Sequence, residues 1–561
     1  MNEALYLEKL KVLWDKAWPV NTPRLPEYPK GKKPLSEYLT QWAQEQPDKL
    51  ALCFYGHDIT YKELDSLSTC FANLLISLGV KPDDRIAVYM PNCPQLHIAF
   101  YGILKCGAVY APVSPLAKEM ELQFQLNDCD TNIILCFDQL LPIVLPVKET
   151  LGIEHVIITS ISELLPKSPT IPLVELFQYP KIENNECIDF YASIHTASSE
   201  AIAYKPKLDD MAALNYTGGT TGLPKGCIHT HGDMLYTCAS YVPVSLGTDS
   251  NMISLNFLPE FWIAGENSGL LFPTFSGTTL VLLARWDVES FLHAIQYYRV
   301  THCGLLVDSV DQLLEYSKVN DFDLSSLTST GCISFIKKLT VDYRERWSNL
   351  TGCTLHEFSF GMTETNTCDT FTSGLQTDNF DLSFSPIFVG LPVPGTEFKV
   401  SDFESGELIP LGNEGELCIR SPSLFKGYWG SNNKDILNNH WFHTGDIGLI
   451  TESGFIRYLG RRKEMLKVNG MSVFPTELEA MLGQHPNILG SAVLGKKDEK
   501  QGQKVIAFVL LKPSSNETEQ SLKDWCKDKM ATYKVPEIKF VTELPMTATG
   551  KVKKQDLEKL L

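Results

Sequence analysis

The chain has 561 residues, more than one hydrophobic core usually supports, and 44% apolar and 21% charged residues are typical of an ordinary globular protein. Its net charge of −18 argues against a nucleic-acid-binding protein, which normally carries a basic stripe. The fifteen cysteines include no Cys-x-x-Cys pair and sit mostly in apolar runs, as reduced and buried thiols do. No signal peptide is evident, and no run approaches the roughly 18 apolar residues of a membrane span. We therefore expect a cytoplasmic protein.

Residues 1–34 predict a polar lead-in whose segment 5–18 has apolar residues at helical spacing. This segment could contact a membrane surface peripherally, but packing on the protein body is favoured. From residue 35 the sequence alternates predicted helices and strands. A Thr60/Glu63 capping box predicts a helix over 60–78. A strand over 86–90, a helix over 94–106 and further elements at 109–112, 117–126 and 131–137 follow, before a less regular bridge over 142–206.

An eleven-residue stretch, 216–226, holds four glycines and three threonines after the apolar run 211–214. Glycine lets backbone N–H groups approach an anion closely, and threonine hydroxyls and a lysine add donors and charge. It is not a Walker A loop, because Leu-Pro separates Gly222 from Lys225. The stretch predicts a polyphosphate-binding loop. Its candidate contacts are Thr217, Gly218, Gly219, Thr220, Thr221, Gly222 and Lys225.

Beyond this loop, apolar runs at 251–258, 279–283, 303–307 and 354–358 predict a second layer of alternating helices and strands, so the fold class is α/β with a largely parallel sheet. Residues 388–460 have the short, glycine-broken segments of a small β-barrel or ribbon. The last hundred residues predict an α+β lid with helices at 475–482 and 519–529 and strands at 491–494 and 505–511. We therefore expect a large domain over 1–460, with subdomains 35–205, 206–387 and 388–460, and a mobile C-terminal lid over 461–561.

Four further motifs follow the glycine loop in order: Phe-Gly-Met-Thr-Glu at 360–364, Trp-Phe-His-Thr-Gly-Asp at 441–446, Gly-Arg-Arg-Lys-Glu at 460–464, and Pro-Met-Thr-Ala-Thr-Gly-Lys at 545–551. Together they resemble the motifs of the adenylate-forming (ANL) superfamily, which includes acyl-CoA synthetases, luciferases and peptide-synthetase adenylation domains. The resemblance spans residues 35–561 and favours the acyl-CoA synthetase, or fatty-acid–CoA ligase, branch.

The resemblance implies roles for the reacting groups. Lys551 would contact the carboxylate and the α-phosphate of ATP, offsetting the charge that builds up as one anion attacks another. Thr363 would bind the α-phosphate. Glu364, together with Thr220 of the glycine loop, would hold Mg²⁺, a hard cation that prefers oxygen ligands.

The same resemblance implies a nucleotide site and a hinge. Asp446 and Arg461 would reach the ribose. Phe360 takes the place of the family's adenine-stacking tyrosine, and simple core packing of its ring remains an equal alternative. Lys463 matches the hinge about which the lid turns between two half-reactions. The other cofactor-binding candidates are Gly361, Met362, Lys467 and Gly470, the last of them beside the path of coenzyme A.

The substrate pocket of the family would involve Trp262, Ile263, Gly331 and Cys332. Trp262 replaces the aspartate of peptide synthetases, which disfavours an amino-acid substrate. Its indole could either close the bottom of a short pocket or act as a gate to a tunnel for an alkyl chain. Glu260 is expected to face outward, because a carboxylate would repel an acid substrate. His229 and His231 are expected to pack behind the loop or cap a helix rather than bind a metal.

The resemblance therefore implies an ATP- and Mg²⁺-dependent ligase that converts a carboxylic acid to an acyl-adenylate and then, with coenzyme A, to acyl-CoA and AMP. The acid would be a medium- or long-chain fatty acid or an aryl acid. An acyl-AMP ligase that loads a carrier protein is the alternative. A luciferase is weaker, since nothing marks oxygen chemistry, and a non-catalytic nucleotide sensor should have lost Lys551, Glu364 or Asp446. The chain length of the acid is left open, and so is the oligomeric state, for which a homodimer is possible.

Overall fold

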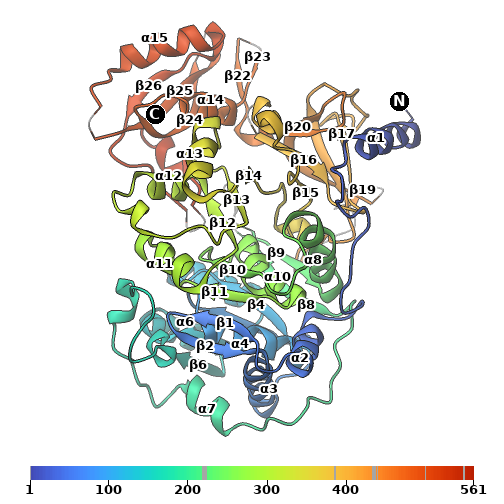
Figure 1. The fold of residues 1–561 in the computed structure, drawn as a ribbon, viewed down its shortest axis with the longest axis vertical. Helices are drawn as coiled ribbons and strands as arrows, with labels where there is room; N and C mark the ends of the chain where they lie inside the picture. The colour runs from blue at the N-terminus through green and yellow to red at the C-terminus, as the bar shows by residue number, and fades with distance from the viewer. Residues whose placement is uncertain are drawn as a thin grey trace.

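The structure is a computed structural model that describes residues 2–217, 224–384, 387–431, 437–438, 440–469, 471–498, 501–513, 515–547 and 550–561. Its strands form four sheets. Two largely parallel sheets occupy the lower and middle parts of the molecule, an antiparallel sheet lies at the upper right, and the C-terminal domain lies at the upper left (Figure 1). The predicted α/β class, with a barrel-like sheet and a C-terminal α+β domain, is confirmed.

The first sheet has the strand order β7-β6-β5-β3-β4-β8-β9, parallel except for the β8–β9 pair. The capping box predicted at Thr60 is present and opens α3. The bridge expected to be irregular nevertheless contributes β6 to this sheet, so the sequence analysis missed a buried strand there. The elements are β3 (Arg85–Tyr89), β4 (Val109–Val113), β5 (Ile133–Phe137), β6 (His155–Thr159), β7 (Ile188–Asp189), β8 (Met211–Tyr216), β9 (Gly226–Thr230), α3 (Tyr61–Ser77), α4 (Pro94–Lys105), α5 (Glu119–Asp128), α6 (Leu141–Leu151) and α7 (Phe190–Thr196).

The second sheet has the order β14-β13-β12-β10-β11-β1-β2. Its strands β1 and β2 come from the N-terminal region, while β8 and β9 pair with the first sheet, so the two sheets exchange strands across the boundary expected at residue 206. The elements are β1 (Leu50–Phe54), β2 (His57–Thr60), β10 (Ile253–Asn256), β11 (Thr279–Leu282), β12 (His302–Leu306), β13 (Ser329–Ile333), β14 (Leu355–Glu357), α2 (Leu35–Glu45), α8 (His231–Ser245), α9 (Ile263–Glu266), the π-helical η4 (Asn267–Leu271), α10 (Phe272–Ser276), α11 (Val288–Tyr298), α12 (Val307–Glu315) and α13 (Val341–Thr351).

The third sheet is antiparallel and carries the N-terminal helix α1 (Glu3–Ala17) against it (Figure 1). Tyr6, Leu10 and Trp14 are buried, and the Trp14 indole donates a 2.8 Å hydrogen bond to the Gly454 carbonyl. The expected packing of this helix on the body is confirmed. Within the described residues, no helix is both long and apolar enough to cross a bilayer. The strands are β15 (Thr370–Phe371), β16 (Ile387–Pro392), β17 (Glu397–Ser401), β18 (Gly415–Arg420), β19 (Leu437–Asn438), β20 (Trp441–Ile450) and β21 (Ile456–Arg461).

The C-terminal domain packs over the second sheet. A Cβ added at Gly490 would lie 2.7 Å from Ile336, and one at Gly550 would lie 3.5 Å from Leu306. The predicted strand over 491–494 is longer in the structure, because it pairs along its length with β25. The elements are β22 (Leu466–Val468), β23 (Met471–Val473), β24 (Ile488–Asp498), β25 (Gly502–Leu511), β26 (Glu537–Phe540), α14 (Pro475–Leu482), α15 (Glu519–Lys529) and α16 (Lys554–Glu558).

Candidate functional site

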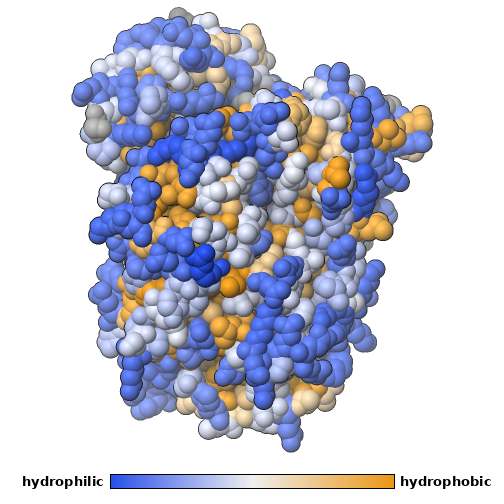
Figure 2. All heavy atoms as spheres, in the orientation of Figure 1, coloured by the Kyte–Doolittle hydropathy of each residue, from blue (hydrophilic) through white to orange (hydrophobic). Residues whose placement is uncertain are grey.

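A cavity of about 2410 Å³ lies where the C-terminal domain meets the second and third sheets. The space-filling view shows a notch at the top of the molecule between the C-terminal domain and the third sheet (Figure 2). Residues at the carboxyl ends of β13 and β14 line the cavity. Parallel sheets usually bind ligands at this edge. Motif residues that are far apart in sequence meet there: Thr217, Phe360, Gly361, Met362, Thr363, Glu364, Asp446, Arg461, Lys463 and Lys551.

The 360–364 motif follows β14 and leads into the short 3₁₀ helix η6 (Thr363–Thr365). A Cβ at Gly361 would approach the Cys368 nitrogen to 2.6 Å, so only glycine fits against the returning chain. The Thr363 carbonyl oxygen is 2.7 Å from Nε2 of His229, so His229 packs behind this motif, whereas the sequence analysis expected it to pack behind the glycine loop or to cap a helix. Phe360 is 8% exposed and packs on Phe398 and Tyr458, yet it also lines the cavity, so its ring serves the core and presents an edge or face to a ligand.

Glu364 meets the requirements of a divalent-cation ligand. Its side chain lines the cavity, and its Oε1 accepts a 2.8 Å hydrogen bond from the Tyr428 hydroxyl. The other carboxylate oxygen of Glu364, Oε2, is a hard oxygen ligand that could bind a divalent cation beside the phosphates of ATP. Tyr428, which the sequence analysis did not single out, belongs to a segment 64 residues away from Glu364, and no local pattern marked it.

Asp446 lies within β20 and not at a helix N-terminus. Its carboxylate is 1% exposed and forms a 2.7 Å ion pair with Nε of Arg461 on the neighbouring strand β21. Burial raises the pKa of Asp446 to about 7, although Arg461 and then Lys551 act in the opposite direction. Glu416 holds the turn before Asp446, because its Oε1 accepts a 2.9 Å hydrogen bond from the Gly445 nitrogen. Glu416 is a second residue that sequence reasoning missed.

Lys551 comes from the C-terminal domain and reaches the same cavity. Its Nζ is 5.3 Å from the centre of the Phe335 ring. Its positive charge acts to lower the pKa of Asp446. Protein from both domains surrounds the ammonium group, and this burial, followed by the charge of Arg461, lowers the pKa of Lys551. Lys463 lies in the 3₁₀ turn η8 (Arg462–Glu464) that joins the two domains, where a hinge is expected.

Not every predicted contact is brought to the cavity. Lys467 is exposed on β22, where its Nζ donates to the Ser472 hydroxyl at 2.8 Å. The Lys225 Nζ lies 4.9 Å from the centre of the Tyr428 ring. The backbone nitrogen of Lys225 donates a hydrogen bond to the Thr217 hydroxyl. The remaining predicted positions lie outside the described residues: Gly218, Gly219, Thr220, Thr221, Gly222 and Gly470.

The cavity extends away from the motifs along the second sheet. It is lined in turn by Trp262 and Phe335, whose rings are 5.8 Å apart, and then by residues at the opposite end of the strands. That deep end includes Met252 before β10 and His302 at the start of β12, with α8 and α10 as the facing wall. A four-residue strand such as β10 spans about 13 Å. The arrangement favours the tunnel over the short pocket, with Trp262 at the tunnel entrance beside Ile263.

Two predicted pocket residues are set back from this tunnel. A Cβ at Gly331 would lie 2.0 Å from the ring of Phe358, so Phe358 covers this glycine and itself lines the cavity. Cys332 is fully buried, because its side chain points to the other face of β13. Phe358 lines the cavity beside these two positions, and the part of Gly331 and Cys332 in the substrate pocket stays a prediction.

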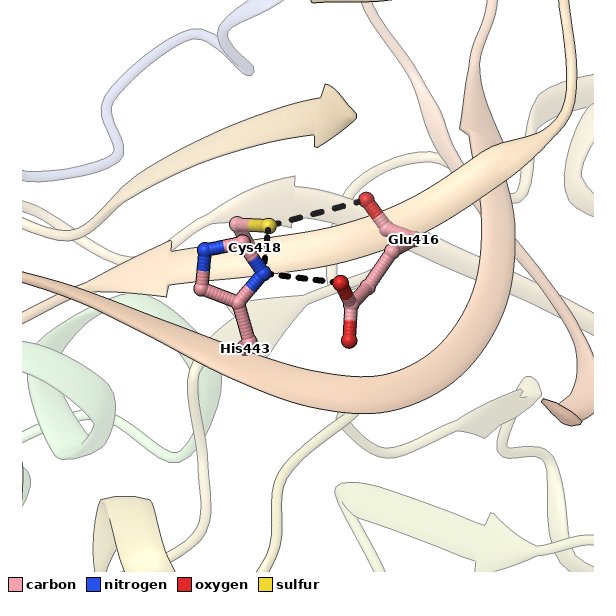
Figure 3. Close-up of side chains that lie close together, drawn as sticks. All are labelled: Glu416, Cys418 and His443. Atoms are coloured by element: carbon pink, nitrogen blue, oxygen red, sulfur yellow. Dashed lines mark hydrogen bonds and ion pairs between the residues drawn. The ribbon is translucent and has the colours of Figure 1, made fainter. Parts of the chain in front are cut away.

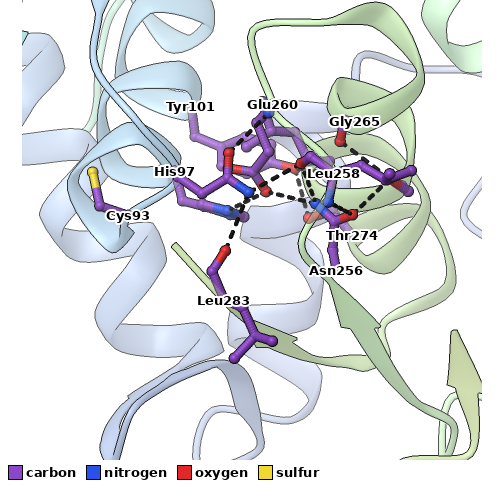
Figure 4. A network of polar contacts seen from close by, with 12 residues as sticks. Cys93, His97, Tyr101, Asn256, Leu258, Glu260, Gly265, Thr274 and Leu283 are labelled. Carbon is purple, nitrogen blue, oxygen red and sulfur yellow. Dashed lines mark hydrogen bonds and ion pairs between the residues drawn. The ribbon is translucent and has the colours of Figure 1, made fainter. Parts of the chain in front are cut away.

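The expectation that Glu260 faces outward is wrong. Glu260 is 0% exposed, and its Oε1 lies 3.0 Å from Nε2 of His97 on α4 (Figure 4). The Asn256 amide contributes a longer contact of 3.4 Å to the same oxygen, and the backbone nitrogen of Glu260 donates to Asn92 at 2.9 Å. Glu260 therefore joins the first and second sheets instead of meeting solvent or substrate.

Replacing Glu260 with alanine should lower the free energy of unfolding by about 3–5 kcal/mol, because His97 loses a buried partner. Urea denaturation followed by tryptophan fluorescence measures the change. Glu45→Ala is the control, because Glu45 forms an ion pair with Lys30 at the surface and should lose less than about 1 kcal/mol. Equal stability of the two variants would contradict the joining role of Glu260.

Comparison with known proteins gives a consistent result. Residues 39–429 match the family model of the AMP-binding enzymes, and residues 477–551 match that of the AMP-binding enzyme C-terminal domain. A long-chain-fatty-acid–CoA ligase of Bacillus subtilis (strain 168) is 32% identical over 97% of both chains, and one of Escherichia coli O157:H7 is 32% identical over 98% of both. The crystal structure of the anthranilate CoA ligase AuaEII with anthranoyl-AMP superimposes with a TM-score of 0.82 at 26% identity, covering 94% of this chain and 97% of that one.

Proposed function

Because the chain belongs to the AMP-binding enzyme family, within the ANL superfamily, we propose that it is an ATP-dependent acyl-CoA ligase for long-chain fatty acids. The observation that carries the substrate class is the tunnel that leads from the motif residues past Trp262 to Met252 and His302. This tunnel continues beyond Trp262 to the far end of the strands, and a substrate with a single aromatic ring would not need that space. The two bacterial relatives whose names specify long-chain fatty acids support the same choice.

In the first half-reaction, a carboxylate oxygen attacks the α-phosphorus of ATP, and the bond to the β-phosphate breaks to release pyrophosphate. The Lys551 ammonium faces the meeting point of the two anions and stabilises the charge that gathers there. Thr363 donates to an α-phosphate oxygen, and Asp446 accepts from the ribose hydroxyls. Phe360 presents its ring to the adenine, and the glycine loop holds the β- and γ-phosphates.

The cation expected here is Mg²⁺, and the carboxylate of Glu364 fits it as an oxygen donor beside the phosphates. When bound, Mg²⁺ neutralises phosphate charge. The task of the protein is to hold that carboxylate still, and the hydrogen bond from Tyr428 does so.

In the second half-reaction, the sulfur of coenzyme A attacks the acyl carbonyl carbon, and AMP leaves. Lys551 would obstruct the approach of a thiol, since it lies over Phe335 and lines the cavity. We infer that the C-terminal domain turns about Lys463 and brings the segment around Gly470 to the opening. One site can then exclude water first and admit a thiol afterwards.

Pyrophosphate release with a panel of acids tests the substrate class. Hexadecanoate should give the highest kcat/KM, with octanoate lower and benzoate lowest. A preference for benzoate would overturn the fatty-acid assignment in favour of an aryl acid. Turnover unchanged by coenzyme A would instead favour an acyl-AMP ligase that loads a carrier protein.

Narrowing the tunnel should change the chain-length preference. Ser254 on β10 lines the tunnel, and Ser254→Phe places a ring across its deep half. We expect kcat/KM for hexadecanoate to fall at least about tenfold, a loss of about 1.4 kcal/mol. Octanoate has half as many carbons, so we expect it to be used as efficiently as by the wild type, and this result would also show that the variant folds. Equal losses for both acids would contradict the proposed path of the chain.

A further inference from the structure

Three side chains of different ligand chemistry converge in the third sheet: Glu416 and Cys418 on β18, and His443 on β20 (Figure 3). The register of the two antiparallel strands places Cys418 directly opposite His443. Strands of a packed sheet hold such a pair rigidly, so the cluster does not depend on a flexible loop. The offered ligand atoms all lie within 4.8 Å of one another.

The distances suit a small tetrahedral cation. The Cys418 Sγ lies 3.5 Å from Nδ1 of His443, and that nitrogen lies 2.7 Å from Oε2 of Glu416. Bonds of about 2.0–2.3 Å to a tetrahedral Zn²⁺ put its ligand atoms about 3.3–3.7 Å apart. The sulfur–nitrogen separation already meets that requirement, and the nitrogen–oxygen pair has to open by less than about 1 Å.

Neighbouring groups orient two of the three ligands. Oε1 of Glu416 accepts the hydrogen bond from the Gly445 nitrogen, which leaves Oε2 to face His443. The Cys418 sulfur is 3.1 Å from the Ser401 hydroxyl. Such outer partners fix ligand orientation in established metal sites.

One coordination position would open to the large cavity. Glu416 and His443 line that cavity, and the His443 side chain is 31% exposed, whereas Cys418 is fully buried. A water molecule can therefore complete the tetrahedron.

We propose that Glu416, Cys418 and His443 form a binding site for a thiophilic divalent cation of the Zn²⁺ type. On binding, the Cys418 thiol and Nδ1 of His443 each give up any proton they carry to solvent, and the metal–sulfur and metal–nitrogen bonds form. The thiolate and the Glu416 carboxylate then balance the two positive charges, so no net charge is buried. The soft sulfur ligand distinguishes this site from the hard oxygen site expected at Glu364.

Occupancy of this site has a consequence for the neighbouring motif. Glu416 links the cluster to Gly445, and Asp446 is the next residue. A cation that draws Glu416 toward Cys418 therefore acts on the turn that carries Asp446. The proposal does not depend on the ligase activity, because it rests on the cluster alone.

Titration of the full-length, metal-free protein with Co²⁺ tests the site, because a tetrahedral Co²⁺–thiolate complex absorbs in the near ultraviolet. We expect a thiolate band that saturates at one Co²⁺ per chain, is removed by equimolar Zn²⁺ and is unaffected by excess Mg²⁺. Cys418→Ala should abolish the band. His443→Gln should weaken Co²⁺ binding at least about tenfold.

Cys136→Ala is the matched control, because Cys136 is an equally buried strand cysteine of β5. It should retain the full band, and far-ultraviolet circular dichroism should show that all three variants are folded. No thiolate band in the wild type, or a band that survives Cys418→Ala, would overturn the proposal. If Cys418→Ala does not fold, the His443→Gln titration decides: an unchanged affinity contradicts the site.

Discussion

Replacing Lys551 with alanine is expected to slow acyl-adenylate formation by about 10²–10³-fold, the loss typical of removing one charge-stabilising donor from an active site. Thioester formation from preformed acyl-adenylate should remain close to the wild-type rate, because we propose that the C-terminal domain turns and carries Lys551 away in that step. The two half-reactions are measured separately, by pyrophosphate release and by acyl-CoA formation from synthetic adenylate.

Lys559→Ala controls for loss of a lysine from the same domain. Lys559 lies at the exposed C-terminal end of α16, paired with Asp556 at 2.6 Å, and its loss should change neither rate. Equal slowing of both half-reactions in Lys551→Ala would show that Lys551 acts on the whole site and not on adenylation alone.

Replacing Asp446 with alanine should lower kcat/KM for ATP by about 10²-fold or more. Each hydrogen bond to a charged acceptor contributes about 1.5–3 kcal/mol, and the carboxylate can accept one from each ribose hydroxyl. The variant also leaves Arg461 without the 2.7 Å ion pair that orients it. Initial rates at varied ATP and saturating fatty acid measure the effect.

Glu452→Ala is the control for Asp446, because Glu452 is an exposed carboxylate that follows the same strand. It should leave the ATP dependence unchanged. An unaltered kcat/KM for ATP in Asp446→Ala would exclude the ribose contact.

The sequence was most informative where chemistry is local. The capping box at Thr60 and the motifs that hold Glu364, Asp446 and Lys551 each combine residue types whose function depends on close neighbours in the chain. The structure brings those three motif residues to one cavity. A few adjacent residues determine where a helix starts and which motif binds a ligand, so both could be predicted from the sequence.

Long-range packing could not be predicted in this way. Glu260 was expected to face outward because a carboxylate would repel an acid substrate, and its buried partner His97, 163 residues away, could not be identified from the sequence. Gly331 seemed to face the substrate because Phe358, which covers it, belongs to the chain beyond β14. Strands β1 and β8 joined the sheets that their positions in sequence did not suggest, because strand pairing follows the tertiary fold.

The tunnel is a third property that only the assembled structure provides. Trp262 could be either the floor of a short pocket or a gate, and the sequence held no information to choose between them. The choice depends on whether space remains between α8, α10 and the second sheet beyond the indole. The lining residues Met252 and His302 show that it does.

The most direct test of the central claim is product analysis by mass spectrometry after incubation with hexadecanoate, ATP and coenzyme A. We predict equal amounts of hexadecanoyl-CoA, AMP and pyrophosphate, with no ADP. AMP and pyrophosphate without hexadecanoyl-CoA, or ADP in place of AMP, would contradict the assignment as an adenylate-forming acyl-CoA ligase.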